Sequence, residues 1–519
     1  MSRRDRTTRQ PAEPAAPPDD AGAALAGPVS WMGRVAGAAR RHWLVSVLLA
    51  AGLVLRVLAE VGYRPALLYI DSYKYLYHAD GNDPVGYRVL LKPVLAVANL
   101  DAVAAVQHLL GLAMAVAIYV LLLRHGTARW LAALAVAPVL LDAYQLQIEQ
   151  TIMPDAMFEA LLVAGLVVLL WRPAPALGQV ALAGLLLGAT APVWQVGEVL
   201  IVPAVVYVAF TAAGWRRTLS HVVVVCVAFA LPIVAYESAA DAAGGHFRLA
   251  NGGITTFYGR AAAAADCRTL RLPADERALC PSRALVAQLG IDGLEHSQRS
   301  PLRPLYLRLP SYQATRLVSA FNRQVLTQQP GRVAVAIGKD AAGIFAVDRV
   351  TSPGDTPISR WQFQDTYPQY RGYVQIQDGR ILLYHENQYG RPVLFTSTQD
   401  MGGGPAVIAP VARFLRGYQL DGGYAPGPLL LVCVLLGLAG SVLLLRRRRN
   451  TSEQARDAAR ACCLIFAAGA VILLSADATE FSWRYQLPAL VTLPVAAALA
   501  VTPLSFLLTG IHTRTPSAL

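Results

Sequence analysis

The stretch VAAVQHLLGLAMAVAIYVLLL, residues 103–123, contains no Asp, Glu, Lys or Arg and is followed at once by Arg124. A helix needs about 20 mostly apolar residues to cross a bilayer, so this stretch predicts a transmembrane helix. Similar segments recur on both sides of it. Together they predict an α-helical polytopic membrane protein with ten spans, at 43–60, 103–123, 130–147, 156–171, 177–193, 196–213, 219–238, 427–445, 460–476 and 486–509.

Composition agrees with a membrane protein and argues against a nucleic-acid binder. Of the 519 residues, 55% are hydrophobic and only 15% are charged, whereas soluble domains have about 25% charged residues. The net charge is +12, but the basic residues cluster in short segments between apolar runs, where they set membrane orientation. Arginine far outnumbers lysine, and Ala and Val are abundant, which is typical of a GC-rich bacterial genome.

Arginine placement predicts the orientation of the chain in the bacterial plasma membrane. If the ten segments simply alternate, the flanking arginines all fall on one side, which the positive-inside rule makes the cytoplasm. Both termini are then cytoplasmic. The arginines concerned are Arg34, Arg40, Arg41, Arg124, Arg129, Arg172, Arg216, Arg217, Arg446, Arg447, Arg448, Arg449 and Arg514.

The same topology predicts the domain organisation. The long polar segment should be an extracytoplasmic domain of mixed α/β type, with helices at 313–328 and 332–346 and strands within 371–397. The predicted parts are a disordered cytoplasmic tail at 1–42, an N-terminal transmembrane module at 43–238 with its first outward loop at 61–102, the extracytoplasmic domain at 239–426, C-terminal transmembrane helices at 427–509 and a cytoplasmic tail at 510–519.

Two cysteines, Cys267 and Cys280, lie outside the predicted spans. An extracytoplasmic compartment is oxidising, so we expect them to form a disulfide. The remaining cysteines lie in apolar runs, where a thiol usually acts as a small hydrophobic side chain. No Cys/His cluster with zinc spacing accompanies them, and the sequence leaves the presence of a metal open.

The first outward loop carries an acid, Asp71, just outside the first span, followed by tyrosines that suit the membrane interface. Two basic residues of this loop, Lys74 and Arg88, are candidates for binding an anionic substrate. The simpler alternative is that Asp71 caps a helix lying in the interface.

Two further outward segments carry charged residues at the ends of spans. Glu149 lies beside apolar sequence, where an ionisable residue is a functional candidate by default. The alternative interpretation is that Glu149 is simply solvated at the end of a span. Asp155 opens the fourth span and would suit the positive end of its dipole as a cap. Arg484, followed by Tyr485, opens the last span on the outer side; its guanidinium suits a lipid phosphate, and the alternative is a snorkelling side chain.

These segments, taken in order, resemble the GT-C superfamily of polytopic glycosyltransferases, in the branch of the protein O-mannosyltransferases and the lipid A aminoarabinose transferase. The resemblance covers residues from about 43 to 213 and 477–495. It rests on an acid in the first outward loop (Asp71–Leu76), an acid opening the fourth span (Asp155–Phe158), a Gly/Leu-rich span (Gly184–Pro192) and a late Arg-Tyr-x-x-Pro motif (Arg484–Pro488). The chain departs from the family at Ala191, where arginine is usual.

The resemblance implies an inverting transfer of a sugar from a polyprenyl-phosphate carrier to an acceptor on the outer face. Asp71 would act as general base, and Asp155 would orient the acceptor or assist Asp71. A divalent metal between the two acids stays open. The sequence names neither the sugar nor the acceptor, which is a protein, a lipid or a polysaccharide. The residues expected to bind substrate are Arg484, Tyr485, Lys74, Arg88 and Glu149.

Two alternatives belong to other functional classes. A transporter or flippase of lipid-linked sugars would place ionisable groups at mid-membrane and often has repeated halves, and the sequence has no clear internal repeat. A non-catalytic scaffold that presents the domain at 239–426 would have no need for Asp71, Asp155 and Arg484 on one face.

Cysteine labelling in intact cells tests the predicted topology. A cysteine introduced near residue 300 should react with a membrane-impermeant thiol reagent, whereas one introduced near residue 448 should react only after the membrane is permeabilised. The opposite pattern would reverse the orientation of the chain and move the candidate residues to the cytoplasmic side.

Overall fold

The computed structural model describes residues 37, 39–77, 83–212, 214–250, 253–351, 356–386, 391–445 and 452–512. Most of the predicted N-terminal tail, the arginines at 446–449 and the end of the C-terminal tail lie outside the described residues.

Every one of the ten predicted segments contains helix, but the helices differ in length. Among the described residues, five helices are long and apolar enough to cross a membrane, so the chain has the build of a multi-pass membrane protein. They are α2 (Trp43–Gly62), α5 (Leu100–Arg124), α11 (Trp215–Ala242), α19 (Glu453–Asp477) and the helical stretch Trp483–Val501, which joins η5 (Trp483–Gln486) to α20 (Pro488–His512).

The span predicted at 130–147 is broken in two. Helices α6 (Arg129–Leu141) and α7 (Ala143–Gln150) meet at an angle of 48°, and as a pair they make a sixth candidate span. Asp142 causes the break, because its Oδ1 accepts the Tyr144 N–H at 2.9 Å and caps α7. Arg349 fixes the bend by donating from Nη2 to Asp142 Oδ2 at 2.7 Å.

Ten full spans are not established, because the helices of the remaining predicted segments are not among the candidate spans. Helices α8 (Asp155–Leu170) and α18 (Gly427–Leu445) match their predicted segments in length, whereas the segments at 177–193 and 196–213 are not continuous α-helices. The predicted segment at 177–193 ends its helix at Gly188, and the next one begins as a 3-10 turn before it becomes α-helical. The proline at position 192 explains the interruption, since it cannot continue a helix. The helices of these two segments are α9 (Leu177–Gly188), η1 (Gln195–Leu200) and α10 (Ile201–Thr211).

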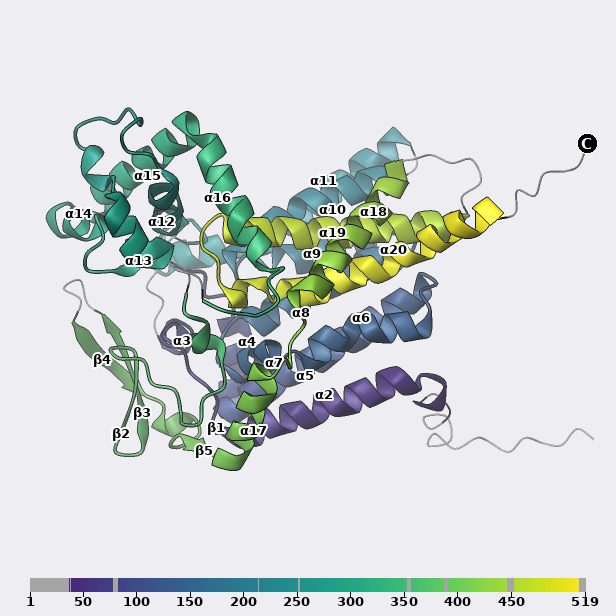
Figure 1. The fold of residues 1–519 in the computed structure, drawn as a ribbon, viewed down its shortest axis with the longest axis horizontal. Coiled ribbons are helices and arrows are strands. Elements are labelled where there is room, and N and C mark those ends of the chain that lie inside the picture. Colours follow the sequence, from purple (N-terminus) through teal and green to yellow (C-terminus); the bar gives the residue numbers. More distant parts are fainter. Residues whose placement is uncertain are drawn as a thin grey trace, which may run out of the picture.

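The long apolar helices run side by side, and the polar part of the chain gathers at one end of them, at the left of Figure 1. The helices there form a layer with a hydrophobic core of its own, around Tyr258, Leu279, Val318 and Phe321. The predicted helices at 313–328 and 332–346 are present in this layer. Its members are α12 (Gly253–Ala264), η2 (Arg277–Leu279), α13 (Arg283–His296), α14 (Leu302–Arg308), α15 (Ser311–Gln328) and α16 (Pro330–Gly343).

A three-stranded antiparallel sheet lies at the same end but shares the core of the bundle, through Val374, Ile381 and Leu383. The polar segment thus contributes residues to two hydrophobic cores. The sheet has the order β2-β3-β4, and β1 pairs with β5. The remaining elements are β1 (Tyr63–Arg64), α3 (Ser72–Leu76), α4 (Arg88–Val97), η3 (Ile358–Trp361), β2 (Val374–Gln377), β3 (Arg380–Glu386), β4 (Pro392–Ser397), η4 (Gln399–Met401), β5 (Ala406–Val407) and α17 (Ala409–Leu420).

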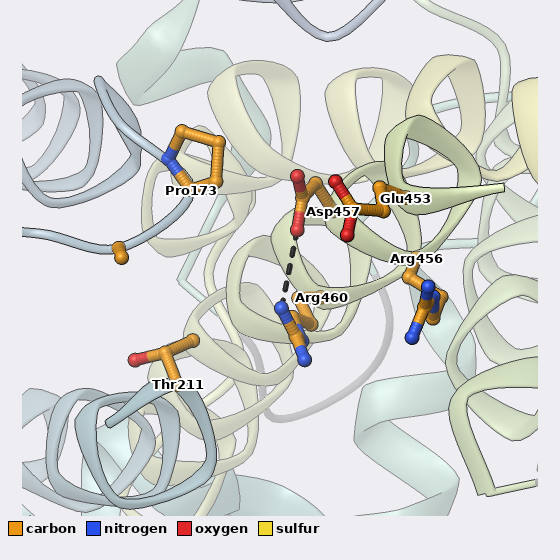
Figure 2. Close-up of a pocket in the computed structure, with 7 residues that line it drawn as sticks. Pro173, Thr211, Glu453, Arg456, Asp457 and Arg460 are labelled. Carbon is orange, nitrogen blue, oxygen red and sulfur yellow. Dashed lines mark hydrogen bonds and ion pairs between the residues drawn. The ribbon is translucent and has the colours of Figure 1, made fainter. Parts of the chain in front are cut away.

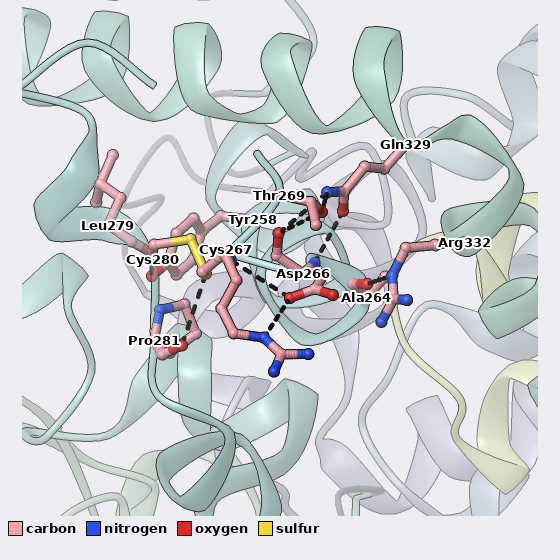
Figure 3. Close-up of a disulfide and its surroundings, with 11 residues drawn as sticks. Tyr258, Ala264, Asp266, Cys267, Thr269, Leu279, Cys280, Pro281, Gln329 and Arg332 are labelled. Carbon is pink, nitrogen blue, oxygen red and sulfur yellow. Dashed lines mark hydrogen bonds and ion pairs between the residues drawn. A yellow bond between two sulfur atoms is a disulfide. The ribbon is translucent and has the colours of Figure 1, made fainter. Parts of the chain in front are cut away.

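A disulfide joins Cys267 to Cys280 and closes the loop between α12 and α13 (Figure 3). The loop is also tied to the end of α15, because the Gln329 side chain donates to the Asp266 carbonyl at 3.1 Å. Arg332 adds a bond from Nε to the Ala264 carbonyl at 2.9 Å. The helical layer is therefore cross-linked both covalently and by hydrogen bonds where α12 ends.

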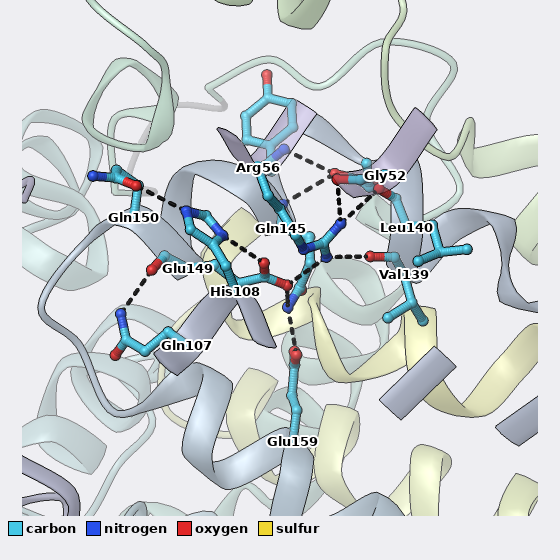
Figure 4. Close-up of polar contacts among 12 residues, drawn as sticks. Gly52, Arg56, Gln107, His108, Val139, Leu140, Gln145, Glu149, Gln150 and Glu159 are labelled. Carbon is cyan, nitrogen blue, oxygen red and sulfur yellow. Dashed lines mark hydrogen bonds and ion pairs between the residues drawn. The ribbon is translucent and has the colours of Figure 1, made fainter. Parts of the chain in front are cut away.

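Inside the bundle, Glu149 is fully buried and belongs to a polar network (Figure 4). Its Oε1 accepts from Arg56 Nη2 at 2.9 Å, and its Oε2 lies 2.9 Å from His108 Nδ1. Arg56 also donates to the carbonyls of Val139 and Leu140, at 3.1 and 3.0 Å, so it binds α6 at the end that precedes the bend. A solvated position for Glu149 at the end of a span is thus wrong. A carboxylate buried this deeply needs such partners, which gives Glu149 a structural task.

Replacement of Arg56 by Met should destabilise the bundle. The substitution leaves the buried Glu149 without its main cation, a change that typically costs about 3–5 kcal/mol. The expected result is a clearly lower thermal midpoint and a lower yield of monodisperse protein in detergent. Arg129→Met, at an exposed position at the start of α6, serves as the control. Equal midpoints for the two variants would contradict a stabilising role for the ion pair.

Candidate functional site

A cavity of about 1040 Å³ lies where the helical layer, the first outward loop and the loop before α20 meet. It is lined by four of the residues that the sequence singled out, Asp71, Lys74, Arg484 and Tyr485. Pro154 also lines it, next to Asp155 in the chain. Residues from three distant stretches of sequence therefore reach one space.

A second, smaller cavity of about 240 Å³ lies beside the N-terminal end of α19 (Figure 2). Arg460 pairs there with Asp457 at 3.1 Å, and Glu453 and Arg456 complete the charged lining. Since α19 has 25 residues and is about 37 Å long, this cavity and the loop before α20 lie at opposite ends of the helix. It contains none of the candidate residues from the sequence.

Backbone pairing brings the first and second outward segments together. Leu67 donates its N–H to the Gln150 carbonyl at 2.9 Å and accepts the Ile152 N–H at 2.9 Å. The Ser72 hydroxyl donates to the Ile152 carbonyl at 3.0 Å and accepts the Tyr69 N–H at 2.9 Å. These bonds set the start of α3, and with it Asp71, against the segment that leads into α8.

Asp71 occupies the N-cap position of α3 but makes no side-chain capping bond, which argues against the capping alternative. Its carboxylate instead lies 3.1 Å from Lys74 Nζ and 3.9 Å from Arg484 Nη1. Burial on its own would raise the pKa of Asp71, but Lys74 and Arg484 outweigh that effect and lower it. Asp71 is therefore ionised at neutral pH.

Asp155 and Arg484 form a buried ion pair. Asp155 is the first residue of α8, and its Oδ1 accepts from Arg484 Nε at 2.7 Å. The two side chains are 5% and 7% exposed. Asp155 Oδ2 has no hydrogen-bond partner among the described residues. The residue thus anchors the guanidinium and keeps one carboxylate oxygen available.

Aromatic rings hold the Arg484 guanidinium from the other sides. Its central carbon lies 5.4 Å from the centroids of both the Trp361 and the Tyr485 rings, a distance that allows cation–π attraction. Tyr485 in turn packs against Trp194, with ring centroids 5.4 Å apart. Arg484 faces acids and aromatic rings inside the protein, which is not the environment of a snorkelling arginine.

Two of the predicted substrate-binding residues do not line the cavity. Glu149 belongs to the buried network of the bundle. Arg88 donates from Nε to the Tyr75 carbonyl at 3.0 Å and from Nη2 to the Lys74 carbonyl at 2.7 Å. It therefore supports the backbone of α3 from behind, and any effect it has on the site acts through Lys74.

Several cavity residues were not predicted from the sequence. Arg360 lines the cavity and donates from Nη1 to the Tyr69 hydroxyl at 3.1 Å. Glu480 also lines it, with Thr356 as a hydrogen-bond donor to its carboxylate. Glu480 lies four residues before Arg484, within the segment 477–495 that resembles the family, so its proximity was available as a signal. The residues contributed by α13, Asp292, Glu295 and His296, carried none.

Neighbouring charges and desolvation shift the pKa of two of these residues, Glu480 and His296. Burial raises the pKa of Glu480 to about 7, assisted by Asp292 and opposed by Thr356 and His296. For His296, whose side chain is 65% exposed, partial desolvation would lower the pKa, but the hydrogen bond to Asp292 and the charge of Glu295 raise it to about 10. At neutral pH, His296 is therefore protonated, and Glu480 exchanges its proton readily.

A metal site is not evident among the residues that the structure describes. No group of three or more His, Cys, Asp and Glu side chains is arranged there to hold an ion. Between Asp71 and Asp155 lies Arg484, which contacts both carboxylates.

Comparisons with known proteins give a limited result. No protein-family model matches the chain, and no curated protein matches it. Among solved structures, the archaeal oligosaccharyltransferase AglB from Archaeoglobus fulgidus, in complex with an inhibitory peptide and a dolichol-phosphate, is similar with a TM-score of 0.39 and 11% identity. The match covers 93% of this chain but only 53% of AglB, so the chain spans about half the length of that enzyme.

Proposed function

We propose that this chain is a membrane glycosyltransferase of the GT-C type, which transfers a sugar from a polyprenyl phosphate to an acceptor hydroxyl. The observation that carries the proposal is the meeting of Asp71, Asp155 and Arg484: Asp71 and Arg484 line one cavity, and Asp155 pairs with Arg484 beside it. These residues come from three segments far apart in the sequence, each next to a candidate span or to the bent helix pair. Helix caps and lipid anchors would have no reason to converge, and neither would the charged residues of a passive scaffold.

The reaction needs charge stabilisation and a proton acceptor. The acceptor oxygen forms a bond to the anomeric carbon while the bond from that carbon to the phosphate oxygen breaks. The phosphate leaves with the electron pair, and the hydroxyl proton passes to a carboxylate. A single displacement of this kind inverts the configuration at the anomeric carbon.

Arg484 suits the growing negative charge on the leaving phosphate. Asp155 holds it through Nε, and Trp361 and Tyr485 restrict the plane of the guanidinium. A cation fixed before the reaction starts stabilises the transition state without reorganisation at that moment. Lys74 adds a second positive charge on the same wall of the cavity.

The proposed setting is the outer face of a bacterial plasma membrane. The bundle would provide the surface for the polyprenyl tail, and the helical layer would face the acceptor. Sugar transfer at that face suits a cavity at the polar end of the bundle. The small cavity beside α19 would then lie on the cytoplasmic side.

Arg484→Lys should impair transfer although it keeps the positive charge. A lysine cannot donate to Asp155 and to a phosphate with the planar fork of arginine, so we expect at least a tenfold lower rate. The measurement is transfer of radiolabelled sugar from the native lipid fraction in membranes that lack the endogenous copy. Arg413→Lys, at an exposed position on α17, is the matched control. Full activity of Arg484→Lys would exclude a phosphate-binding role.

Asp71→Asn should reduce transfer by about 10²–10⁴-fold while the protein folds and inserts normally, because asparagine keeps the size of the side chain but lacks the negative charge that the site uses. The same assay measures the rate, and protein level in the membrane checks folding. Asp378→Asn is the control, since Asp378 lies in a turn with φ of 51°, a conformation that Asn tolerates. Near-normal transfer by Asp71→Asn would leave the proposal with only family likeness to support it.

A further inference from the structure

Glu480 is a buried carboxylate that shares the cavity with Asp71. It is 6% exposed and lies between the end of α19 and the start of η5. The Thr356 hydroxyl donates to its Oε1. This bond fixes the carboxylate and occupies one of its oxygens, at a wall of the cavity that also carries Arg484.

Helix α13 provides a charged neighbourhood for Glu480. Asp292 Oδ1 lies 3.2 Å from His296 Nδ1, and Glu295 Oε1 lies 3.9 Å from His296 Nε2. Glu295 also accepts from the Thr256 hydroxyl at 2.7 Å. The charged and titratable groups that face Glu480 are Asp292, Glu295 and His296 of α13, Arg360 of η3 and Tyr485 of η5.

The two carboxylates differ in how strongly cations engage them. Asp71 faces Lys74 at 3.1 Å and Arg484 at 3.9 Å, and these cations lower its pKa despite its burial. A carboxylate stabilised in this way holds a proton weakly. Burial and the charge of Asp292 raise the pKa of Glu480 to about 7. This value is close to the optimum for a general base at neutral pH.

The hydroxyl group of Ser482 is a further polar group of this cavity. Ser482 lies between Glu480 and Arg484 in the chain, lines the same cavity and is 2% exposed. Its Oγ has no hydrogen-bond partner among the described residues. A buried hydroxyl without a partner is costly, and an oxygen of the substrate would satisfy it.

We infer that Glu480, rather than Asp71, receives the proton of the acceptor hydroxyl, and that Asp71 instead holds Lys74 and Arg484 in place for the donor phosphate. The inference rests on the proposed function and assigns a different residue to one step of it. The acceptor loses its proton to Glu480 Oε2, the oxygen that Thr356 does not contact, as its own oxygen bonds to the anomeric carbon. The phosphate leaves with the electrons of the broken bond, and Ser482 orients the acceptor oxygen.

The pH dependence of transfer by the full-length protein separates the two carboxylates. The wild-type rate, measured with the radiolabelled native lipid fraction as donor, should rise about tenfold per pH unit below pH 7 and level off above it, since the base must be deprotonated. Glu480→Gln should lose about 10²–10⁴-fold and also lose this rise. Asp71→Asn should be slow at every pH but keep the rise near pH 7.

Two neighbours of Glu480 offer a test that leaves the base itself in place. Asp292→Asn removes a negative charge that raises the pKa of Glu480, so the rise should move to lower pH. His296→Gln removes a positive charge that lowers this pKa, so the rise should move to higher pH. A purely structural role of α13 would not produce shifts of opposite sign. Glu276→Gln, in the same helical layer but outside the cavity lining, should leave the profile unchanged.

The outcomes distinguish the inference from the proposed function. Retention of the rise near pH 7 in Glu480→Gln, or its loss in Asp71→Asn, would overturn the assignment of the proton to Glu480. Absence of sugar transfer by the wild-type protein would overturn the proposed function itself. If Glu480→Gln fails to reach the membrane, the two shifts from Asp292→Asn and His296→Gln decide the matter, and unshifted profiles would refute the inference.

Discussion

The buried ion pair between Asp155 and Arg484 is the contact on which the candidate site depends. At 2.7 Å it connects the start of α8 to the loop before α20, two segments 329 residues apart. Neither charge is well exposed to water, so each needs the other. Asp71 joins this pair because the backbone of Leu67 is paired with the segment that leads to Asp155, and the Arg484 guanidinium then lies within reach of both acids.

The cations of this cluster are already paired before any substrate arrives. Arg484 faces Asp71 and Asp155, and Lys74 faces Asp71 and Asp83, so three carboxylates surround two cations. A phosphate entering the cavity therefore has to share cations that are already paired. Such sharing favours a ligand whose negative charge grows during the reaction, because the cations gain more from the leaving phosphate than from the bound donor.

Each apolar segment predicted from the sequence contains helix, because an apolar run is a local feature of composition. The sequence could not foresee the bend at Asp142, which depends on Arg349, 207 residues further on. It also misjudged Glu149, whose partner Arg56 lies inside another predicted span and has no local signature. The α13 residues escaped notice for the same reason: an Asp and a His four residues apart look like an ordinary polar helix face until the fold turns them toward a cavity.

The helical layer is more than a cover for the site, because it supplies charges that tune a residue of the bundle. Arg260 of α12 is 2% exposed, donates to the Asp477 carbonyl at 2.8 Å and pairs with Asp340 of α16. This contact fixes the layer to the end of α19, three residues before Glu480. Because α12 packs against α13, this buried arginine helps to position α13 near Glu480. Whatever loosens that attachment also changes the electrostatic environment of the carboxylate, so the layer and the bundle form one chemical unit although their hydrophobic cores are separate.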